Sequence, residues 1–262
     1  MTKQTMKAVV KAKPDVGAVL LDVPVPEIGE EEVLVKVMAA GLCGSDVHTY
    51  LWEKSMHYKT PYLPLILGHE FSGQVIQVGR QVTSVAVGDR ILARPTHPCG
   101  TCWFCRHHQP ENCTNRSTSG ITKDGAFAEY CAIHEDQVIH MPDQMTWEQG
   151  ALIEPLGVGA SCVLRAELHY GDFVVISGPG TIGLCALLAA RAQGAGRIAI
   201  YGTKKDRQRL ALARELGADY TFVVEECDIV QEILSLTSGQ GAEIALECTG
   251  VPALLQTNLS LV

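Results

Sequence analysis

The chain has 262 residues, of which 47% are hydrophobic and 19% are charged. This length and composition suit one large domain, or two smaller ones, with a full hydrophobic core. The net charge is −8, from 21 basic and 29 acidic residues, and no basic run is long enough to follow a phosphate backbone. The composition therefore argues against nucleic acid as a partner.

The start of the chain and its cysteines bear on the cellular compartment. Residues 1–15 lack the apolar run and small-residue cleavage site of a signal peptide, and no stretch of about 18 apolar residues occurs. Five of the ten cysteines are scattered without a pairing pattern: Cys131, Cys162, Cys185, Cys227 and Cys248. Free thiols in a reducing compartment fit better than a disulfide framework. We therefore expect a cytoplasmic protein without a membrane partner.

Residues up to about 150 are expected to be mostly β structure. Apolar and polar side chains alternate in residues 31–41, and residues 71–79 and 87–93 have the composition of strands. Residues 79–85 and 123–127 are typical of turns or loop ends. The N-terminal half therefore reads as short strands joined by turns.

Two short segments of this half carry possible metal ligands. Cys43 lies in the run GLCGSDVH, and His69 and Glu70 lie in GHE. A thiolate, an imidazole and a carboxylate leave a fourth zinc position open, where the ion acts as a Lewis acid. The alternatives are a buried thiol at Cys43 and a core histidine at His69 that is satisfied by a backbone carbonyl.

Four cysteines then follow within 15 residues, in the spacing C-x2-C-x2-C-x7-C: Cys99, Cys102, Cys105 and Cys113. Four thiolates at about 2.3 Å complete a tetrahedral Zn²⁺ shell, so this spacing predicts a structural zinc site. Two disulfides or four unrelated thiols are the alternatives, and the tight spacing favours zinc. An iron–sulfur cluster fits less well because its usual C-x3-C-P ending is absent.

After residue 155 the sequence pattern changes to strands that alternate with helices. Four apolar runs are each followed by a helical pattern. The apolar runs lie at residues 171–178, 197–202, 220–224 and 242–250. Regular alternation of this kind indicates a parallel, doubly wound sheet and an α/β fold class.

A glycine-rich turn lies between the first of these strands and its helix. It matches G-x-G-x-x-G with the residues Gly178, Pro179, Gly180, Thr181, Ile182 and Gly183. Such glycines permit a tight turn and a close approach of the backbone to a pyrophosphate at the helix N-terminus. A turn that only packs strand on helix is the alternative, and the strand–helix context favours dinucleotide binding.

The end of the second strand bears on the choice of cofactor. NAD enzymes place an acidic residue there, whereas this chain has Thr203, Lys204 and Lys205, and its first carboxylate is Asp206. A small residue and two lysines can admit a 2′-phosphate and pair with its charge, which favours NADP weakly over NAD. Lysines of a solvated loop are the alternative.

Residues 68–82, GHEFSGQVIQVGRQV, fit the signature G-H-E-x2-G-x5-G-x2-V. With CGSDVH, the four-cysteine lobe and the glycine turn in the same order, the chain resembles zinc-containing medium-chain alcohol dehydrogenases over essentially its whole length. The resemblance implies a GroES-like β-rich catalytic domain at residues 1–155, with the structural zinc lobe at 97–115. It also implies a Rossmann domain at residues 156–262 and an active site in the cleft between the two.

The resemblance also implies roles for individual residues. The implied ligands or exchanging carboxylates of a catalytic zinc are Cys43, His69, Glu70 and Glu154. Asp46 resembles the carboxylate that orients the zinc-binding histidine, and Ser45 and His48 resemble the relay that carries the alcohol proton to solvent. The remaining histidines belong to no motif and are expected at the surface or in packing: His57, His97, His107, His108, His134, His140 and His169.

Glu154 lies in GALIEPLGVG, which resembles the sorbitol or L-iditol branch and the related L-threonine 3-dehydrogenases. This implies a zinc-dependent oxidoreductase that transfers hydride between a secondary, polyol-type alcohol and NAD(P)⁺, with L-threonine as the alternative substrate. The implied cofactors are two Zn²⁺ per chain and NAD(P), and the implied partner is a small-molecule alcohol.

The last expectation concerns the length of the dinucleotide domain. The full fold has strand order 3-2-1-4-5-6, and this sequence supplies the first four strands. We therefore expect a partial Rossmann domain in a C-terminally truncated chain, and a homo-oligomer for a full-length form. An alternative of another class is a fragment that binds zinc and nucleotide without catalysis.

Overall fold

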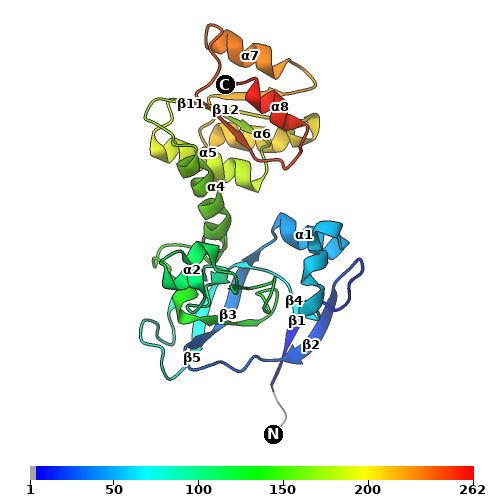
Figure 1. Ribbon diagram of the computed structural model, residues 1–262, viewed down its shortest axis with the longest axis vertical. Coiled ribbons are helices and arrows are strands. Elements are labelled where there is room, and N and C mark those ends of the chain that lie inside the picture. The colour runs from blue at the N-terminus through cyan, green and yellow to red at the C-terminus, as the bar shows by residue number, and fades with distance from the viewer. Residues whose placement is uncertain (1–3) are drawn as a thin grey trace. The chain divides into compact units, whose positions relative to one another are not determined.

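The computed structural model describes residues 4–262 (Figure 1). The chain divides into two compact units, with the division between Glu154 and Pro155. We call these the first unit and the second unit. Among the described residues, none of the helices has both the length and the apolar character that crossing a membrane requires.

The first unit is built on antiparallel sheets. Its five-stranded sheet has the order β10 (Val138–His140), β6 (Arg90–Ala93), β5 (Glu70–Val78), β3 (Glu32–Gly41) and β9 (Tyr130–His134). A three-stranded sheet has the order β2 (Val19–Pro24), β1 (Thr5–Lys11) and β4 (Leu65–Ile66). A small ladder pairs β7 (Thr96–His97) with β8 (Ser117–Thr118).

Short helical segments fill the connections of the first unit. They are α1 (Gly44–Leu51), η1 (Lys54–Tyr62), α2 (Trp103–Arg106), η2 (Pro110–Asn112), η3 (Glu135–Gln137) and α3 (Trp147–Ala151). The core beneath them is formed by alternate side chains of β3, β5, β6 and β9, including Val33, Val35, Phe71, Ile91 and Ile133. The expectation of a mostly β N-terminal half agrees with this architecture.

The second unit is a parallel sheet with the order β13 (Tyr220–Val223), β12 (Arg197–Gly202), β11 (Phe173–Ser177) and β14 (Ile244–Glu247). The helical segments after the strands are α5 (Thr181–Gln193), η4 (Lys204–Asp206), α6 (Arg207–Glu215), α7 (Ile229–Leu236) and α8 (Leu254–Leu259). Numbered along the chain within this unit, the strands have the order 3-2-1-4. This order agrees with the first four positions of the predicted fold. The predicted α/β fold is confirmed.

Both faces of this sheet are buried, which explains the continuous apolar strands. Val174 and Ile176 pack with α5 and α6 on one face, whereas Phe173 and Val175 pack with α7 and Leu261 on the other. Figure 1 shows these helices above and below the sheet of the second unit. The alternation along β11 therefore distributes its side chains between two separate cores.

The sequence did not predict α4 (Ile153–Arg165), whose glycines disfavour a helix. A Cβ added at Gly159 would lie 2.6 Å from the backbone of Cys185 and Ala186 in α5. Close packing of α4 on α5 thus requires glycine at this position. Pro155 lies in the first turn of α4, where a missing N–H costs little.

Candidate metal centres and cofactor-binding loop

Four cysteine sulfurs gather in the lobe that α2 and η2 form, and their Sγ atoms all lie within 4.8 Å of one another. The separations are 3.5 Å for Cys102 and Cys105, 3.8 Å for Cys102 and Cys113, and 3.5 Å for Cys99 and Cys113. Sulfurs at about 2.3 Å from one tetrahedral zinc are about 3.8 Å apart, so this spacing fits zinc. A disulfide requires about 2.05 Å, and no disulfide joins any cysteine of residues 4–262.

Hydrogen bonds to sulfur favour the ligand form of this lobe. The N–H of Cys102 donates to Cys99 Sγ, and the N–H of Cys99 donates to Cys113 Sγ, each at 3.3 Å. Hydrogen bonds from the backbone and side chain of Thr101, and from the Cys102 backbone, lower the pKa of Cys99 to about 6. Because a metal binds the thiolate and not the thiol, these contacts favour Cys99 as a ligand, whereas burial raises the pKa of Cys105 to about 12.

A second group of possible ligands comes from two paired strands. In the antiparallel pairing of β3 with β5, Gly41 lies opposite Glu70. The ligand atoms of Cys43, His69 and Glu70 consequently lie within 4.8 Å of one another. A Cβ at Gly41 would lie 2.3 Å from Glu70 Oε2. A residue larger than glycine at this position would therefore require the carboxylate of Glu70 to move.

Asp46 joins the two halves of this group. Its Oδ2 accepts a hydrogen bond of 3.1 Å from the Cys43 N–H, which begins α1. Its Oδ1 lies 3.7 Å from Nδ1 of His69, and both side chains are buried. Neither of these two atoms has a hydrogen-bond partner. Asp46 thus faces one imidazole nitrogen and leaves Nε2 of His69 for a metal, as carboxylates commonly do.

Burial and charge around this group fit a divalent cation. Burial raises the pKa of Glu70 and of Glu154. Burial also acts to lower the pKa of His69, but its hydrogen bond to Cys43 and the nearby Asp46, Cys43 and Glu154 charges outweigh that effect and raise it. Several acidic groups therefore share a buried space, and a bound divalent cation would compensate their charge.

Glu154 lies beside the group and not within it. Its carboxylate interacts electrostatically with His69, Glu70 and Asp46, but the set of ligand atoms within 4.8 Å of one another contains only Cys43, His69 and Glu70. Glu154 thus sits where a carboxylate could approach a metal when the other ligands shift.

The two predicted relay residues lie on α1, three positions apart. The backbone carbonyl of Ser45 accepts from Thr49 Oγ1 at 2.7 Å. Nδ1 of His48 lies 2.9 Å from Oε2 of Glu53, and both side chains are about half exposed. Within residues 4–262 no hydrogen bond joins the side chains of Ser45 and His48. Glu53, which no motif signalled, therefore orients the outer end of the predicted relay.

Lys59 is a second residue near the site that the sequence did not reveal. Its side chain is fully buried, and Nζ donates to Thr49 Oγ1 at 2.7 Å. Burial lowers the pKa of Lys59, while Asp46 and Cys43 act to raise it. A lysine in a polar segment resembles a surface residue in sequence, so only the fold shows that it brings positive charge beside the candidate ligands.

The glycine turn has the geometry that the G-x-G-x-x-G pattern predicts. Gly178 has a φ of 90°, which favours glycine. A Cβ at Gly183 would lie 1.9 Å from the Gly178 carbonyl oxygen. A Cβ at Gly180, the N-cap of α5, would meet no atom within 4 Å. The turn is thus closed on its inner side and open at the helix N-terminus, where a phosphate binds in such folds.

The loop after β12 is held by carboxylates. Oδ2 of Asp206 accepts hydrogen bonds from the Thr203 N–H at 3.0 Å and the Thr203 hydroxyl at 2.8 Å. The Lys204 N–H donates to Glu225 Oε2 at 3.0 Å, and the side chains of Lys204 and Lys205 are exposed. Asp206 is thereby engaged in capping its own turn, and the two lysines remain open to solvent.

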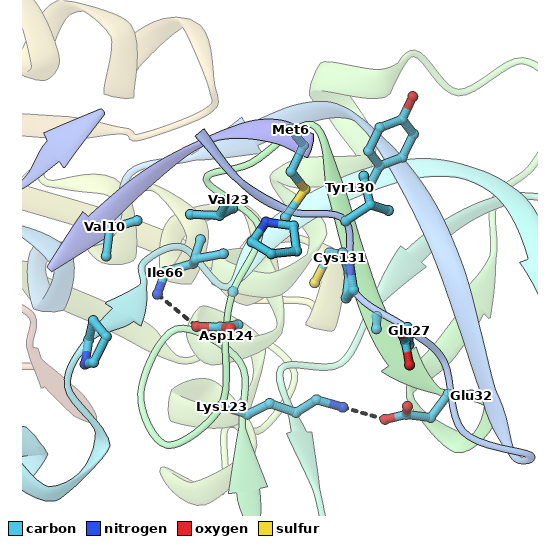
Figure 2. A pocket seen from close by; sticks show the side chains of 16 residues that line it. Met6, Val10, Val23, Glu27, Glu32, Ile66, Lys123, Asp124, Tyr130 and Cys131 are labelled. Carbon is cyan, nitrogen blue, oxygen red and sulfur yellow. Dashed lines mark hydrogen bonds and ion pairs between the residues drawn. The ribbon is translucent and has the colours of Figure 1, made fainter. Parts of the chain in front are cut away.

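The first unit also contains a pocket of about 450 Å³, shown in Figure 2, which includes none of the predicted site residues. Met6, Val10 and Ile66 form part of its apolar wall. Lys123 pairs with Glu32, and Oδ1 of Asp124 accepts from the Ile66 N–H at 2.9 Å (Figure 2). Because these polar groups have partners within the protein, the pocket offers no evident ligand chemistry.

Comparison with known proteins decides the family. A model of the alcohol dehydrogenase GroES-like domain matches residues 29–143, and a model of zinc-binding dehydrogenases matches residues 181–262. Sorbitol dehydrogenase from Halalkalibacterium halodurans is 38% identical, and the match covers 96% of this chain and 72% of that protein. L-threonine 3-dehydrogenase from Bacillus subtilis is 39% identical, and the match covers 100% of this chain and 74% of that protein. The chain belongs to the zinc-binding alcohol dehydrogenase family.

Solved structures agree with this membership. A zinc-binding-dehydrogenase-like protein from Sinorhizobium meliloti, solved with NADP, superposes with a TM-score of 0.91 at 32% identity and covers 99% of this chain and 74% of its own. Galactitol-1-phosphate dehydrogenase from Escherichia coli superposes with a TM-score of 0.87 at 34% identity, and the match covers 98% of this chain and 72% of that protein. The predicted family, enzyme class and use of zinc and NAD(P) are confirmed for this dehydrogenase.

We expect the dehydrogenase, purified without chelator, to contain about two zinc ions per chain, because two ligand sets are complete. Cys102→Ser should lose one ion and destabilise the lobe, whereas Cys43→Ser should lose the other and leave the fold intact. Cys131→Ser, which alters a buried thiol outside both sets, serves as the control. Elemental analysis and thermal unfolding measure these outcomes. A wild-type chain without zinc contradicts both site assignments.

Gly41→Ala should displace the Glu70 carboxylate, since the new Cβ would lie 2.3 Å from Glu70 Oε2. We expect roughly a 10- to 100-fold loss of zinc affinity at the Cys43 site, with the lobe zinc retained. Gly44→Ala is the matched control, because a Cβ there meets nothing within 4 Å. Competition with a chromogenic chelator resolves the two ions. Equal zinc release from both variants would show that the Cys43 site does not need glycine at position 41.

Proposed function

We propose that this dehydrogenase transfers hydride between a secondary, polyol-type alcohol and NAD(P)⁺ at a zinc site held by Cys43, His69 and Glu70. The observation that carries the proposal is the convergence of these three ligand atoms within 4.8 Å of one another beside the buried carboxylate of Glu154. A structural site has four protein ligands, whereas three leave a position for substrate.

A zinc ion at this site supplies Lewis acidity to the substrate hydroxyl. Residues of the chain orient the metal ligand His69 and transfer the alcohol proton. Oδ1 of Asp46 faces Nδ1 of His69 at 3.7 Å, which leaves Nε2 of the ring for the ion. Ser45 and His48 provide a route for the alcohol proton to solvent, and Glu53 keeps the ring of His48 in place.

The substrate class is argued from Glu154. The carboxylate of Glu154 would give a metal held here an exchangeable ligand, which a second group of the substrate could replace. Vicinal diols provide such a group, and relatives named for sorbitol and for D-arabitol phosphate are 38% and 37% identical to this chain. A polyol is therefore the proposed substrate, in preference to ethanol-like compounds.

L-Threonine is the second candidate. Relatives named L-threonine 3-dehydrogenase from Bacillus subtilis and Pyrococcus horikoshii are 39% and 36% identical and match 100% and 99% of this chain. The 3-hydroxyl and 2-amino groups of threonine present the same bidentate arrangement as a vicinal diol. An exchangeable carboxylate at Glu154 therefore suits both candidates.

For the cofactor we propose binding at the turn from Gly178 to Gly183, with a weak preference for NADP. The open space at Gly180 lies at the N-terminus of a 13-residue helix, which attracts the pyrophosphate. Thr203 and the exposed Lys204 and Lys205 are suited to a 2′-phosphate, and the nearby Asp206 is engaged with Thr203.

The proposal includes a cytoplasmic location and a homo-oligomer. The cysteines of the described residues form no disulfide, which suits a reducing compartment. Large apolar side chains are exposed on the second unit, among them Leu164, Tyr170, Leu255 and Leu259. Where such side chains form a contiguous patch, they would support contact with another subunit.

If Lys204 and Lys205 contact a 2′-phosphate, the double change to alanine should lower the preference for NADP⁺ over NAD⁺ by about tenfold or more, as expected for charge-assisted hydrogen bonds. The control is Lys13→Ala with Lys36→Ala, which removes two exposed charges from the first unit. Dissociation constants for both cofactors measure the effect. An unchanged ratio in the loop variant assigns both lysines to an ordinary solvated loop.

A substrate panel tests the proposed activity on the 262-residue chain. We expect kcat/KM for sorbitol or L-iditol to exceed that for ethanol by at least about a hundredfold, because sites built for extra hydroxyls discriminate strongly against their absence. Glu154→Ala should reduce this ratio. A preference for threonine supports the second candidate. A preference for ethanol refutes the argument from Glu154, and absence of NAD(P)-linked turnover on every substrate refutes the proposed activity of this chain.

A further inference from the structure

A third cluster of metal-ligating side chains lies outside both predicted centres. It consists of His97 on β7, His134 at the end of β9 and Asp136 in η3. One ligand atom from each lies within 4.8 Å of the other two. No sequence motif joins these residues, and the histidines were expected at the surface or in packing.

The backbone around the cluster is firmly held. The buried side chain of Gln137 donates from Nε2 to the carbonyls of Arg94 and Pro95, at 2.9 and 3.1 Å. Its Oε1 accepts from the His134 N–H at 3.1 Å, and the Arg94 N–H donates to the Gln137 carbonyl at 2.8 Å. The segment leading to His97 and the turn that begins at His134 are thus tied together independently of the two imidazoles.

The imidazole of His97 has a ring nitrogen without a hydrogen-bond partner. Its Nδ1 is buried and has no hydrogen-bond partner, which is uncommon for a buried nitrogen and calls for a missing group. The ring stacks on that of His134, with centroids 4.0 Å apart and planes 23° apart. Nδ1 of His134 accepts from the Asp136 N–H at 3.1 Å and lies 3.5 Å from Asp136 Oδ2.

Carboxylates surround the two rings on the solvent side. Besides Asp136, Oε2 of Glu31 lies 3.6 Å from Nε2 of His134, and both carboxylates are mostly exposed. Lys123, whose charge acts to lower the pKa of His97, is paired with Glu32. A cation entering this side would meet two acidic groups and two imidazoles.

We propose that His97, His134 and Asp136 form a third metal site, which takes a divalent transition metal ion such as Zn²⁺ or Ni²⁺. Imidazole nitrogen combined with carboxylate oxygen suits these ions, whereas Mg²⁺ and Ca²⁺ prefer all-oxygen sites. The proposal is independent of the dehydrogenase activity.

Binding requires a small closure of the cluster. Ligand atoms around a tetrahedral zinc at about 2.0–2.1 Å are about 3.3 Å apart, so side chains must approach by up to about 1.5 Å. The stacked rings must open toward the ion, and the ion replaces the hydrogen bond between the Asp136 N–H and His134. In return it gives His97 Nδ1 a partner and cross-links β7 to η3.

The experiment titrates Ni²⁺ into the tag-free chain with its zinc retained, and measures bound nickel and zinc together by equilibrium dialysis and elemental analysis. We expect wild type to bind one nickel ion at least about tenfold more tightly than His97→Gln. The control is His140→Gln, because His140 pairs with a carboxylate, Asp89, at 3.0 Å but joins no cluster of three metal-ligating side chains among residues 4–262. The control should bind nickel as wild type does.

His134→Asn repeats the test with a residue that still caps η3 and lies away from the lobe in sequence. It should also weaken nickel binding about tenfold or more, with zinc content unchanged. Nickel should raise the unfolding temperature of wild type and of His140→Gln but not of either cluster variant. Equal nickel affinity in wild type and His134→Asn, or an equal loss in His140→Gln, overturns the third site.

Discussion

The pairing of β3 with β5 is the constraint on which the candidate active site depends. Gly41 lies opposite Glu70 in this ladder, and that register brings Cys43 to His69 although 25 residues of chain separate them. A shift by one residue would turn the Glu70 side chain to the other face of the sheet. The same ladder buries Val33, Val35 and Phe71, so the hydrophobic core enforces the register. The packing of the core and the position of the candidate metal ligands therefore depend on the same strand register in this unit.

The features that sequence could predict are those set by local spacing or by strong periodicity. The lobe cysteines are near one another in the chain, so their spacing alone implied a common centre, and the sulfur separations of 3.5–3.8 Å agree with it. The alternating strands and helices after residue 155 fixed a parallel sheet, and the glycine turn required its own backbone geometry. Cys43, His69 and Glu70 needed the family resemblance as well, because their proximity is created by strand pairing and not by spacing.

The residues that sequence missed are positioned by tertiary contacts that leave no local trace. Lys59 lies in a polar 3₁₀ segment and is buried only because Thr49 and the Gly120 carbonyl receive its Nζ. His97 and His134 meet because Gln137 ties two distant segments together. In α4, glycine disfavours a helix locally, and packing of Gly159 on α5 overrides that preference. In each case a long-range contact outweighs the local propensity.

The most direct test of the central claim is zinc K-edge X-ray absorption on the purified Cys102→Ser chain, in which we expect the lobe ion to be absent. If the β3–β5 register assembles a mixed-donor site, the remaining zinc should have one sulfur neighbour at about 2.3 Å and nitrogen or oxygen neighbours at about 2.0–2.2 Å. Fluorescence at the same edge gives the zinc content of the sample. A remaining zinc with two or more sulfur neighbours, or a chain without zinc, would contradict the account.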